Sequence, residues 1–170
     1  MSSLVKSLSA NRLAAASLAI GALLPLSTMA AITCTFSSVP GIAFGLYDDS
    51  SAAPTDITGF VDVLCTRNGG PNDVTLTVSI GVSANTGQIA NRALKNTASA
   101  VLLNYNLYRD TARSQVWGAV PGIDTGSTTI SNIPNNSSRS ARLNIYGRIT
   151  ALQNATVGNY ADSLLITVLP

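Results

Sequence analysis

The two cysteines of this chain are its residues best suited to covalent chemistry. Cys34 and Cys65 are the only cysteines, and the chain contains no histidine. In an exported protein such a pair is typical of a disulfide, and the alternative is two free buried thiols. Two cysteines without histidine make a poor zinc site, so no metal is expected. A Cys34–Cys65 disulfide would close a loop of about 30 residues and contribute on the order of 3–4 kcal/mol.

The acidic and hydroxyl side chains offer no evident catalytic pair. Asp110 follows Arg109 and lies near Arg113, but arginine does not titrate usefully and no second carboxylate clusters there. Asp48 and Asp49 are adjacent, so their side chains point apart on a strand. We expect turn or surface roles for these aspartates. The serines lack a histidine base and a Gly-x-Ser-x-Gly segment, so neither an enzyme nor a cofactor is expected.

The aromatic residues could form a platform for a carbohydrate, or they could be core and corner residues of a sandwich. The residues concerned are Trp117, Tyr105, Tyr108, Tyr146 and Tyr160. Such residues in a sandwich are more often structural, which is the interpretation we favour. Tyr160 lies just before the last expected strand, where a sandwich can use a tyrosine corner.

The first 30 residues are typical of an export signal. Lys6 and Arg12 make its start positive, residues 13–26 are mostly apolar, and small residues precede a cleavage site expected between Ala30 and Ala31. A membrane anchor is the alternative, but the apolar run is shorter than the roughly 20 residues that a bilayer requires. The mature chain is expected to be a single domain spanning residues 31–170.

The expected mature chain has a net charge close to zero. Of the ten lysines and arginines, two lie in the signal, which leaves eight opposite eight aspartates and no glutamate. A basic face for nucleic acid is therefore not supported. A charge near zero lowers the repulsion between copies, which suits a self-associating protein.

Short alternating runs between Gly-, Pro- and Asn-rich turns predict an all-β, antiparallel sandwich. The expected strands lie at residues 32–36, 42–47, 59–65, 74–80, 102–108, 128–133, 142–149 and 162–169. Residues 68–73 predict a hairpin connection, and residues 83–100 predict a longer polar crossing. No helical periodicity follows the signal.

The alternation also selects the side chains that should face the core. Val61, Val63 and Cys65 form a wholly apolar set, so they are expected to face inward. The other expected sets are Val74, Leu76, Val78 and Ile80; Leu103, Tyr105 and Leu107; Leu143, Ile145 and Gly147; and Leu164, Ile166 and Val168.

Several segments together resemble one known family. They are LNYNLYRD at 103–110, VWG at 116–118, YGRI at 146–149 and GNYAD at 158–162. In order and spacing they are similar to the spore coat protein U domain of Csu-type, archaic chaperone–usher pili. The resemblance covers most of the mature chain, from Cys34 onward. Thr150 departs from it, since the family commonly has proline after YGRI, and this departure affects only a turn.

The resemblance implies an incomplete immunoglobulin-like sandwich that lacks its final strand. A periplasmic pilus chaperone would lend a strand during folding, an outer-membrane usher would assemble the fibre, and a neighbouring pilin subunit's tail would later fill the gap. The protein would then be exported through the periplasm and displayed at the cell surface. No nucleic acid and no small-molecule cofactor are expected among its partners.

The last expected strand, residues 162–169, should border this gap, because only Pro170 follows it. Its inward set, Leu164, Ile166 and Val168, would form the acceptor groove for the donated strand.

The tail that the mature chain could donate is expected to be short. After cleavage at Ala30 only three residues precede Cys34, which is shorter than a usual strand of about five or six residues. The sequence therefore favours an acceptor-only subunit at a fibre tip. The alternative is a secreted coat protein or adhesin that is not built into a pilus.

Overall fold

The computed structural model describes residues 31–170. The expected export signal, with Lys6 and Arg12, lies outside the described residues. Within the described range, no helix is long and apolar enough to cross a membrane. The described strands are β1 (Ala31–Ser38), β2 (Thr55–Asn68), β3 (Val74–Ile80), β4 (Arg92–Asn96), β5 (Leu102–Tyr108), β6 (Gly126–Ile130), β7 (Ser137–Ile149), β8 (Tyr160–Ala161) and β9 (Ile166–Leu169).

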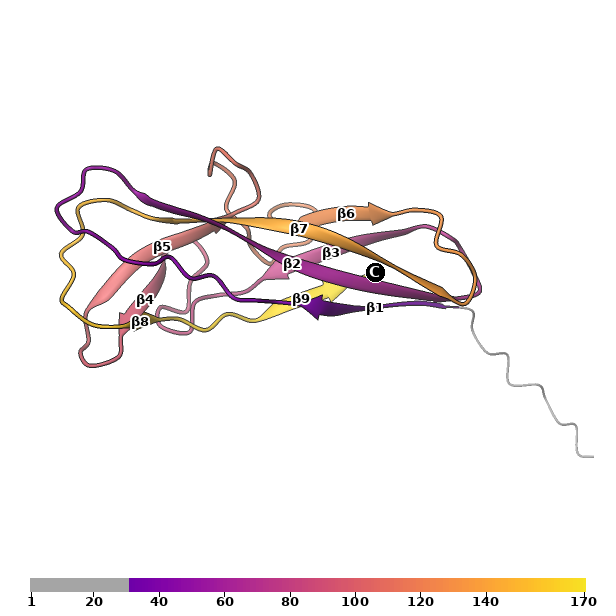
Figure 1. The fold of residues 1–170 in the computed structure, drawn as a ribbon, viewed down its shortest axis with the longest axis horizontal. Coiled ribbons are helices and arrows are strands. Elements are labelled where there is room, and N and C mark those ends of the chain that lie inside the picture. Colours follow the sequence, from indigo (N-terminus) through magenta and orange to yellow (C-terminus); the bar gives the residue numbers. More distant parts are fainter. Residues whose placement is uncertain (1–30) are drawn as a thin grey trace, which may run out of the picture.

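The strands form two antiparallel sheets around one core, as an incomplete immunoglobulin-like sandwich (Figure 1). The larger sheet has the order β1-β2-β7-β5-β4-β8, and the smaller sheet has the order β6-β3-β9. The long strands β2 and β7 pair from Thr55 opposite Ile149 to Arg67 opposite Ser137. The edge strands β1 and β9 lie side by side, and β6 is the opposite edge of the smaller sheet.

The core consists largely of the side chains that the alternation selects. Val61, Val63 and Cys65 of β2 are fully buried, whereas Leu64 on the other face of the strand is 38% exposed. The other buried members of the predicted sets are Leu76, Val78, Ile80, Leu103, Tyr105, Leu107, Leu143, Ile145 and Gly147. These burials confirm the predicted inward faces of β2, β3, β5 and β7.

Residues 42–47 do not form the strand predicted for them. Gly41 and Gly45 adopt φ angles of 74° and 77°, which a continuous strand does not contain. The chain from Val39 to Tyr47 is therefore an irregular loop. Ile42 and Phe44 still pack against the core, so the apolar alternation correctly indicated burial but not backbone pairing.

The hairpin predicted at residues 68–73 is wrong, because this turn connects β2 in one sheet to β3 in the other. Both edges of β2 are already occupied, by β1 and β7, so β3 has no edge to join. The polar crossing predicted at residues 83–100 contains β4, which pairs with β5. Arg92 of β4 is fully buried, so the polar composition of this strand concealed its place in the fold.

The remaining strand bounds agree with the predictions to different degrees. β3 and β5 have the predicted bounds, and β7 begins five residues earlier than predicted, at Ser137. β6 covers Gly126–Ile130 rather than residues 128–133. β9 covers only Ile166–Leu169, the second half of the predicted segment, and the two-residue β8 was not predicted.

Candidate functional site

An apolar hollow of about 210 Å³ opens between the two sheets beside β9. The larger sheet contributes one wall, with side chains from β2, β4, β5 and β7. The loop that follows β1 contributes Ile42 and Phe44, and the C-terminal segment contributes Asp162, Leu164 and Ile166. The hollow therefore brings together three parts of the chain that are far apart in the sequence.

The strand β9 has a hydrogen-bonded neighbour on one side only. It pairs with β3, where Ile166 lies opposite Ile80 and Val168 lies opposite Val78. Among the described strands, nothing pairs with the other edge of β9, and β1 likewise pairs only with β2. Figure 1 shows these two edges beside each other. A further strand that joined β9 at this edge would also cover the hollow.

The groove residues predicted from the sequence lie along this edge. Leu164, Ile166 and Val168 are half-buried and pack against the core. Leu164 and Ile166 line the hollow, whereas Val168 lies farther along β9 and does not. The alternate residues Leu165 and Leu169 are 73% and 58% exposed. The segment thus has one inward apolar face, and that face is incompletely covered.

A polar pair fixes the C-terminal segment at the wall of the hollow. The Tyr105 hydroxyl donates a hydrogen bond of 2.8 Å to Oδ2 of Asp162, and Phe44 packs edge-on against the Tyr105 ring. Burial, together with the hydrogen bond to Asp162, raises the pKa of Tyr105. Oδ1 of Asp162 accepts hydrogen bonds from the Ala84 amide and the Asn85 side chain. Sequence reasoning missed Asp162, because nothing local indicates its partners.

Cys34 and Cys65 form the predicted disulfide. They lie directly opposite each other in the β1–β2 ladder, with their Cα atoms 4.1 Å apart. Cys65 is fully buried on the inner face of β2. The bond holds β1, which is an edge strand, to the larger sheet.

Arg92 is a buried charge that sequence reasoning missed. Its side chain is fully buried, and the guanidinium donates hydrogen bonds to the carbonyl oxygens of Ile80, Gly81 and Trp117. It also donates to Oδ1 of Asn106 at 2.7 Å. Burial lowers the pKa of Arg92. Asn106 is only 7% exposed, although the alternation of β5 places it on the outer face.

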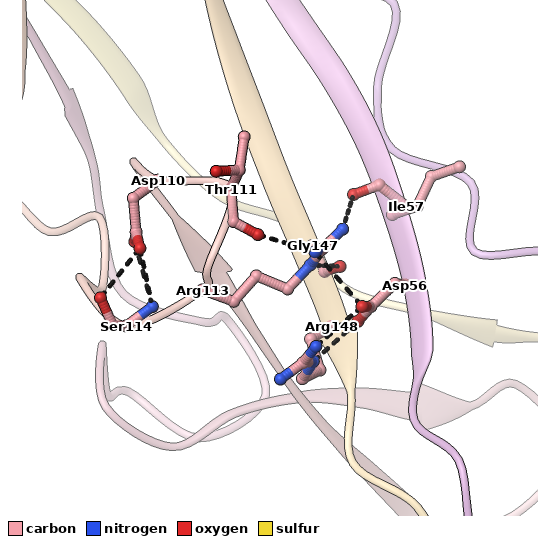
Figure 2. A network of polar contacts seen from close by, with 8 residues as sticks. All are labelled: Asp56, Ile57, Asp110, Thr111, Arg113, Ser114, Gly147 and Arg148. Carbon is pink, nitrogen blue, oxygen red and sulfur yellow. Dashed lines mark hydrogen bonds and ion pairs between the residues drawn. The ribbon is translucent and has the colours of Figure 1, made fainter.

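A polar network ties the loop after β5 to the outer face of the larger sheet (Figure 2). Asp56 accepts two hydrogen bonds from Arg148, of 2.7 and 2.8 Å, and lies 3.2 Å from the Arg113 guanidinium. The hydrogen bond from Arg148 and the charge of Arg113 hold the pKa of Asp56 below its usual value. Asp110 accepts hydrogen bonds from the amide and hydroxyl of Ser114, which confirms its predicted turn role.

Three of the five aromatic residues have the structural roles predicted for them. Trp117 is 1% exposed, and its Nε1 donates a hydrogen bond of 2.8 Å to the Val78 carbonyl. The Tyr160 hydroxyl donates to the Thr156 carbonyl at 2.9 Å, a bond to backbone four residues upstream that makes a tyrosine corner. Tyr105 is 6% exposed and belongs to the core. Tyr108 and Tyr146 are half-buried and lie opposite each other in the β5–β7 ladder.

The hollow offers shape and unpaired backbone groups rather than reactive side chains. An unpaired strand edge beside an apolar groove is suited to binding an extended segment, whose backbone bonds the edge and whose alternate side chains fill the groove.

The chain is similar in sequence to a known protein family and to one of its relatives. The model of the Spore Coat Protein U domain family matches residues 20–167. The chain is 29% identical over 147 residues to "Protein U" of Myxococcus xanthus, a match that covers 79% of this chain and 76% of that protein.

One solved structure with a similar fold is a complex of CsuC and CsuE, a chaperone and tip adhesion subunit of archaic chaperone–usher Csu pili of Acinetobacter baumannii. The TM-score is 0.51 at 15% sequence identity, over 81% of this chain and 40% of the matched chain. The chain thus spans less than half the length of the solved chain that it matches.

Proposed function

The chain belongs to the Spore Coat Protein U domain family, and on this premise we propose that it is a structural or adhesive subunit of a chaperone–usher surface pilus. In this proposal the subunit is completed by a β-strand donated from another protein. The strand joins the unpaired edge of β9 and fills the hollow lined by Leu164 and Ile166.

The open apolar edge of β9 is the observation that carries the proposal. A lone subunit with this edge would expose core side chains and unpaired backbone groups, which favours aggregation. A donated strand would supply ladder hydrogen bonds, and each large apolar side chain that it buried would contribute about 1.5–3 kcal/mol. The donor should therefore be an extended segment with apolar residues at alternate positions.

The proposed partners follow from this need for a strand. A periplasmic pilus chaperone would donate a strand first, an outer-membrane usher would receive the complex, and a neighbouring pilin subunit would replace the chaperone. The proposed location is the cell surface, reached through the periplasm. No reactive site enters this role, so we propose no enzymatic activity.

We further propose that the subunit accepts a strand but donates none, as a subunit at a fibre tip does. β1 begins at Ala31 and pairs with β2 from its first residue. Cys34 is bonded to Cys65, so this part of the chain is engaged in the subunit's own sheet. A donor tail would have to come from residues before Ala31, which the expected cleavage removes.

Substitutions on the two faces of β9 test the proposed groove. Ile166→Asp puts a charge on the half-buried face that lines the hollow, whereas Leu169→Asp makes a matched change at a 58% exposed position of the same strand. We expect Ile166→Asp to lose co-purification with a chaperone from the same organism, and Leu169→Asp to keep it. Equal capture of both variants would argue against the groove. So would secretion of the unchanged subunit as a soluble monomer without a chaperone.

Intact mass and assembly together test the acceptor-only role. The mature chain should begin at Ala31, and it should bind a chaperone but form no fibre alone when the chaperone and usher are supplied. A mature chain that begins there and still polymerises alone would show that another segment acts as the donor.

A surface coat protein that is not built into a pilus is the second candidate. It is favoured by the description of the matching family, the Spore Coat Protein U domain. Immunogold electron microscopy distinguishes the two candidates. Label at fibre ends supports the pilus subunit, and a continuous layer without fibres supports the coat protein.

A further inference from the structure

A second hollow, of about 520 Å³, opens between β6 and β7. β6 and β9 are opposite edges of the smaller sheet, so this hollow is separate from the groove proposed for a donated strand. Its polar lining residues include Arg109, Thr125, Thr128, Asn144 and Tyr146. Whereas the first hollow is mostly apolar, this one is suited to a polar ligand.

Unpaired backbone borders the second hollow on both sides. Among the described strands, β6 pairs only with β3. β7 pairs with β2 along its length, but β5 reaches only its last four residues, from Tyr146 to Ile149. Residues 137–145 of β7 therefore have no strand partner on the side away from β2 within the described structure. Both borders can offer backbone donors and acceptors to a ligand.

Arg109 supplies a charge that the described residues do not neutralise. Its terminal nitrogens donate to the carbonyl oxygens of Thr125 and Ile123, at 3.0 and 3.1 Å. These bonds orient the guanidinium. Its Nε is buried without a hydrogen-bond partner, the one side-chain atom of this kind in residues 31–170. No ion pair in the same range includes Arg109.

The second arginine of the hollow differs, because its charge is already matched. Arg142 makes two hydrogen bonds of 2.7 Å to Asp62 and lies over the Phe60 ring. A ligand would therefore meet one free positive charge, that of Arg109.

Thr128 lies between buried Gly126 and Ile130 on the inward side of β6, where a sandwich strand usually carries an apolar residue. Its hydroxyl is a further polar group of the lining.

We propose that this second hollow binds an acidic sugar, a hexuronic acid unit of a glycan. The Arg109 guanidinium, which lines the hollow and forms no ion pair within residues 31–170, matches the single carboxylate of such a unit. The Thr128 hydroxyl and the unpaired backbone groups of β6 and β7 match its ring hydroxyls. The volume lies in the range of pockets that hold small ligands, about 300–1,000 Å³.

Titration of the mature chain with galacturonic acid tests the proposal, with galactose as the neutral counterpart. The chain is purified from the periplasm with any co-purifying chaperone left bound, and binding is followed through the backbone amide NMR signal of Ser127, which lines the hollow and is present in every variant. Galacturonic acid should shift this signal at millimolar concentration, and galactose should not. Arg109→Lys keeps the charge but loses the donor geometry, so it should weaken binding about tenfold.

Two further variants keep the result interpretable. Thr128→Val has nearly the same shape and should weaken binding by a factor of about 3–10. Arg139→Lys changes an exposed arginine of β7 outside the hollow and should leave binding unchanged. Retained near-ultraviolet circular dichroism in each variant establishes that the fold is intact.

Several results would overturn the proposal. They are equal binding of galactose, no shift at 20 mM galacturonic acid, or equal losses in the Arg109 and Arg139 variants. Inorganic phosphate that binds as tightly as galacturonic acid would also overturn it, since the hollow would then be a general anion site.

Discussion

Reduction of the Cys34–Cys65 disulfide should destabilise the folded protein by about 3.7 kcal/mol. The two cysteines are separated by 31 residues, and the loop-entropy relation gives about 12 cal/mol/K for a loop of this size, which is about 3.7 kcal/mol at 25 °C. In this relation the effect acts on the unfolded chain, because the bond restricts the conformations of the loop that it closes.

Urea denaturation with and without a reductant measures this loss. For a chain of this size the denaturant slope is about 2 kcal/mol/M, so reduction should lower the midpoint by about 2 M. The double variant Cys34→Ala/Cys65→Ala should be insensitive to the reductant and at least as unstable, since Cys65 is fully buried. A midpoint shift below about 0.5 M would refute the loop-entropy reasoning. Two labelled thiols in unreduced, denatured protein from the periplasm would refute the bond itself.

Three further predictions concern single side chains. Arg92→Met leaves several buried carbonyl oxygens without a donor and should cost about 3 kcal/mol in urea denaturation; a loss below about 1 kcal/mol would contradict the role assigned to Arg92. Because the hydrogen bond from Arg148 lowers the pKa of Asp56, the stability that Asp56 contributes is present above its unfolded pKa of about 4 and is lost as pH falls through the lower folded pKa. Acidification should therefore lower the urea midpoint of Asp56→Asn less than that of the unchanged protein. An equal decrease in both proteins would contradict this linkage. A Cβ at Gly126 would collide with the Trp117 ring, so Gly126→Ala should cost about 1–3 kcal/mol and shift the tryptophan fluorescence; unchanged stability and fluorescence would show that the ring can move.

The local alternation of apolar and polar residues predicted those strands whose inner face is apolar and whose backbone is regular. β3 and β5 meet both conditions, and their bounds agree with the prediction. At residues 42–47 the apolar alternation is present, but Gly41 and Gly45 turn the backbone out of the strand conformation. The pattern indicates which side chains are buried, whereas strand pairing also requires an extended backbone.

The apolar face formed by Leu164, Ile166 and Val168 could be predicted because it follows from the alternation within one segment. Leu164 and Ile166 line the hollow, and their role in accepting a strand stays a prediction. Arg92 and Asp162 could not be predicted, because their partners are carbonyl, amide and hydroxyl groups from other strands and loops. Their burial depends on groups that only the folded chain brings together.

The Cys34–Cys65 bond also determines how the subunit would respond to tension. A pull on the chain at Ala31 reaches Cys34 after three residues and passes through the covalent bond directly to β2. The residues between the two cysteines cannot lengthen while the bond is intact, which withholds roughly 110 Å of contour length at about 3.5 Å per residue. The load passes instead to β2, which pairs with β7 from Thr55 to Arg67. An oxidised subunit should therefore be a stiff element, and a reduced one should extend further under the same force.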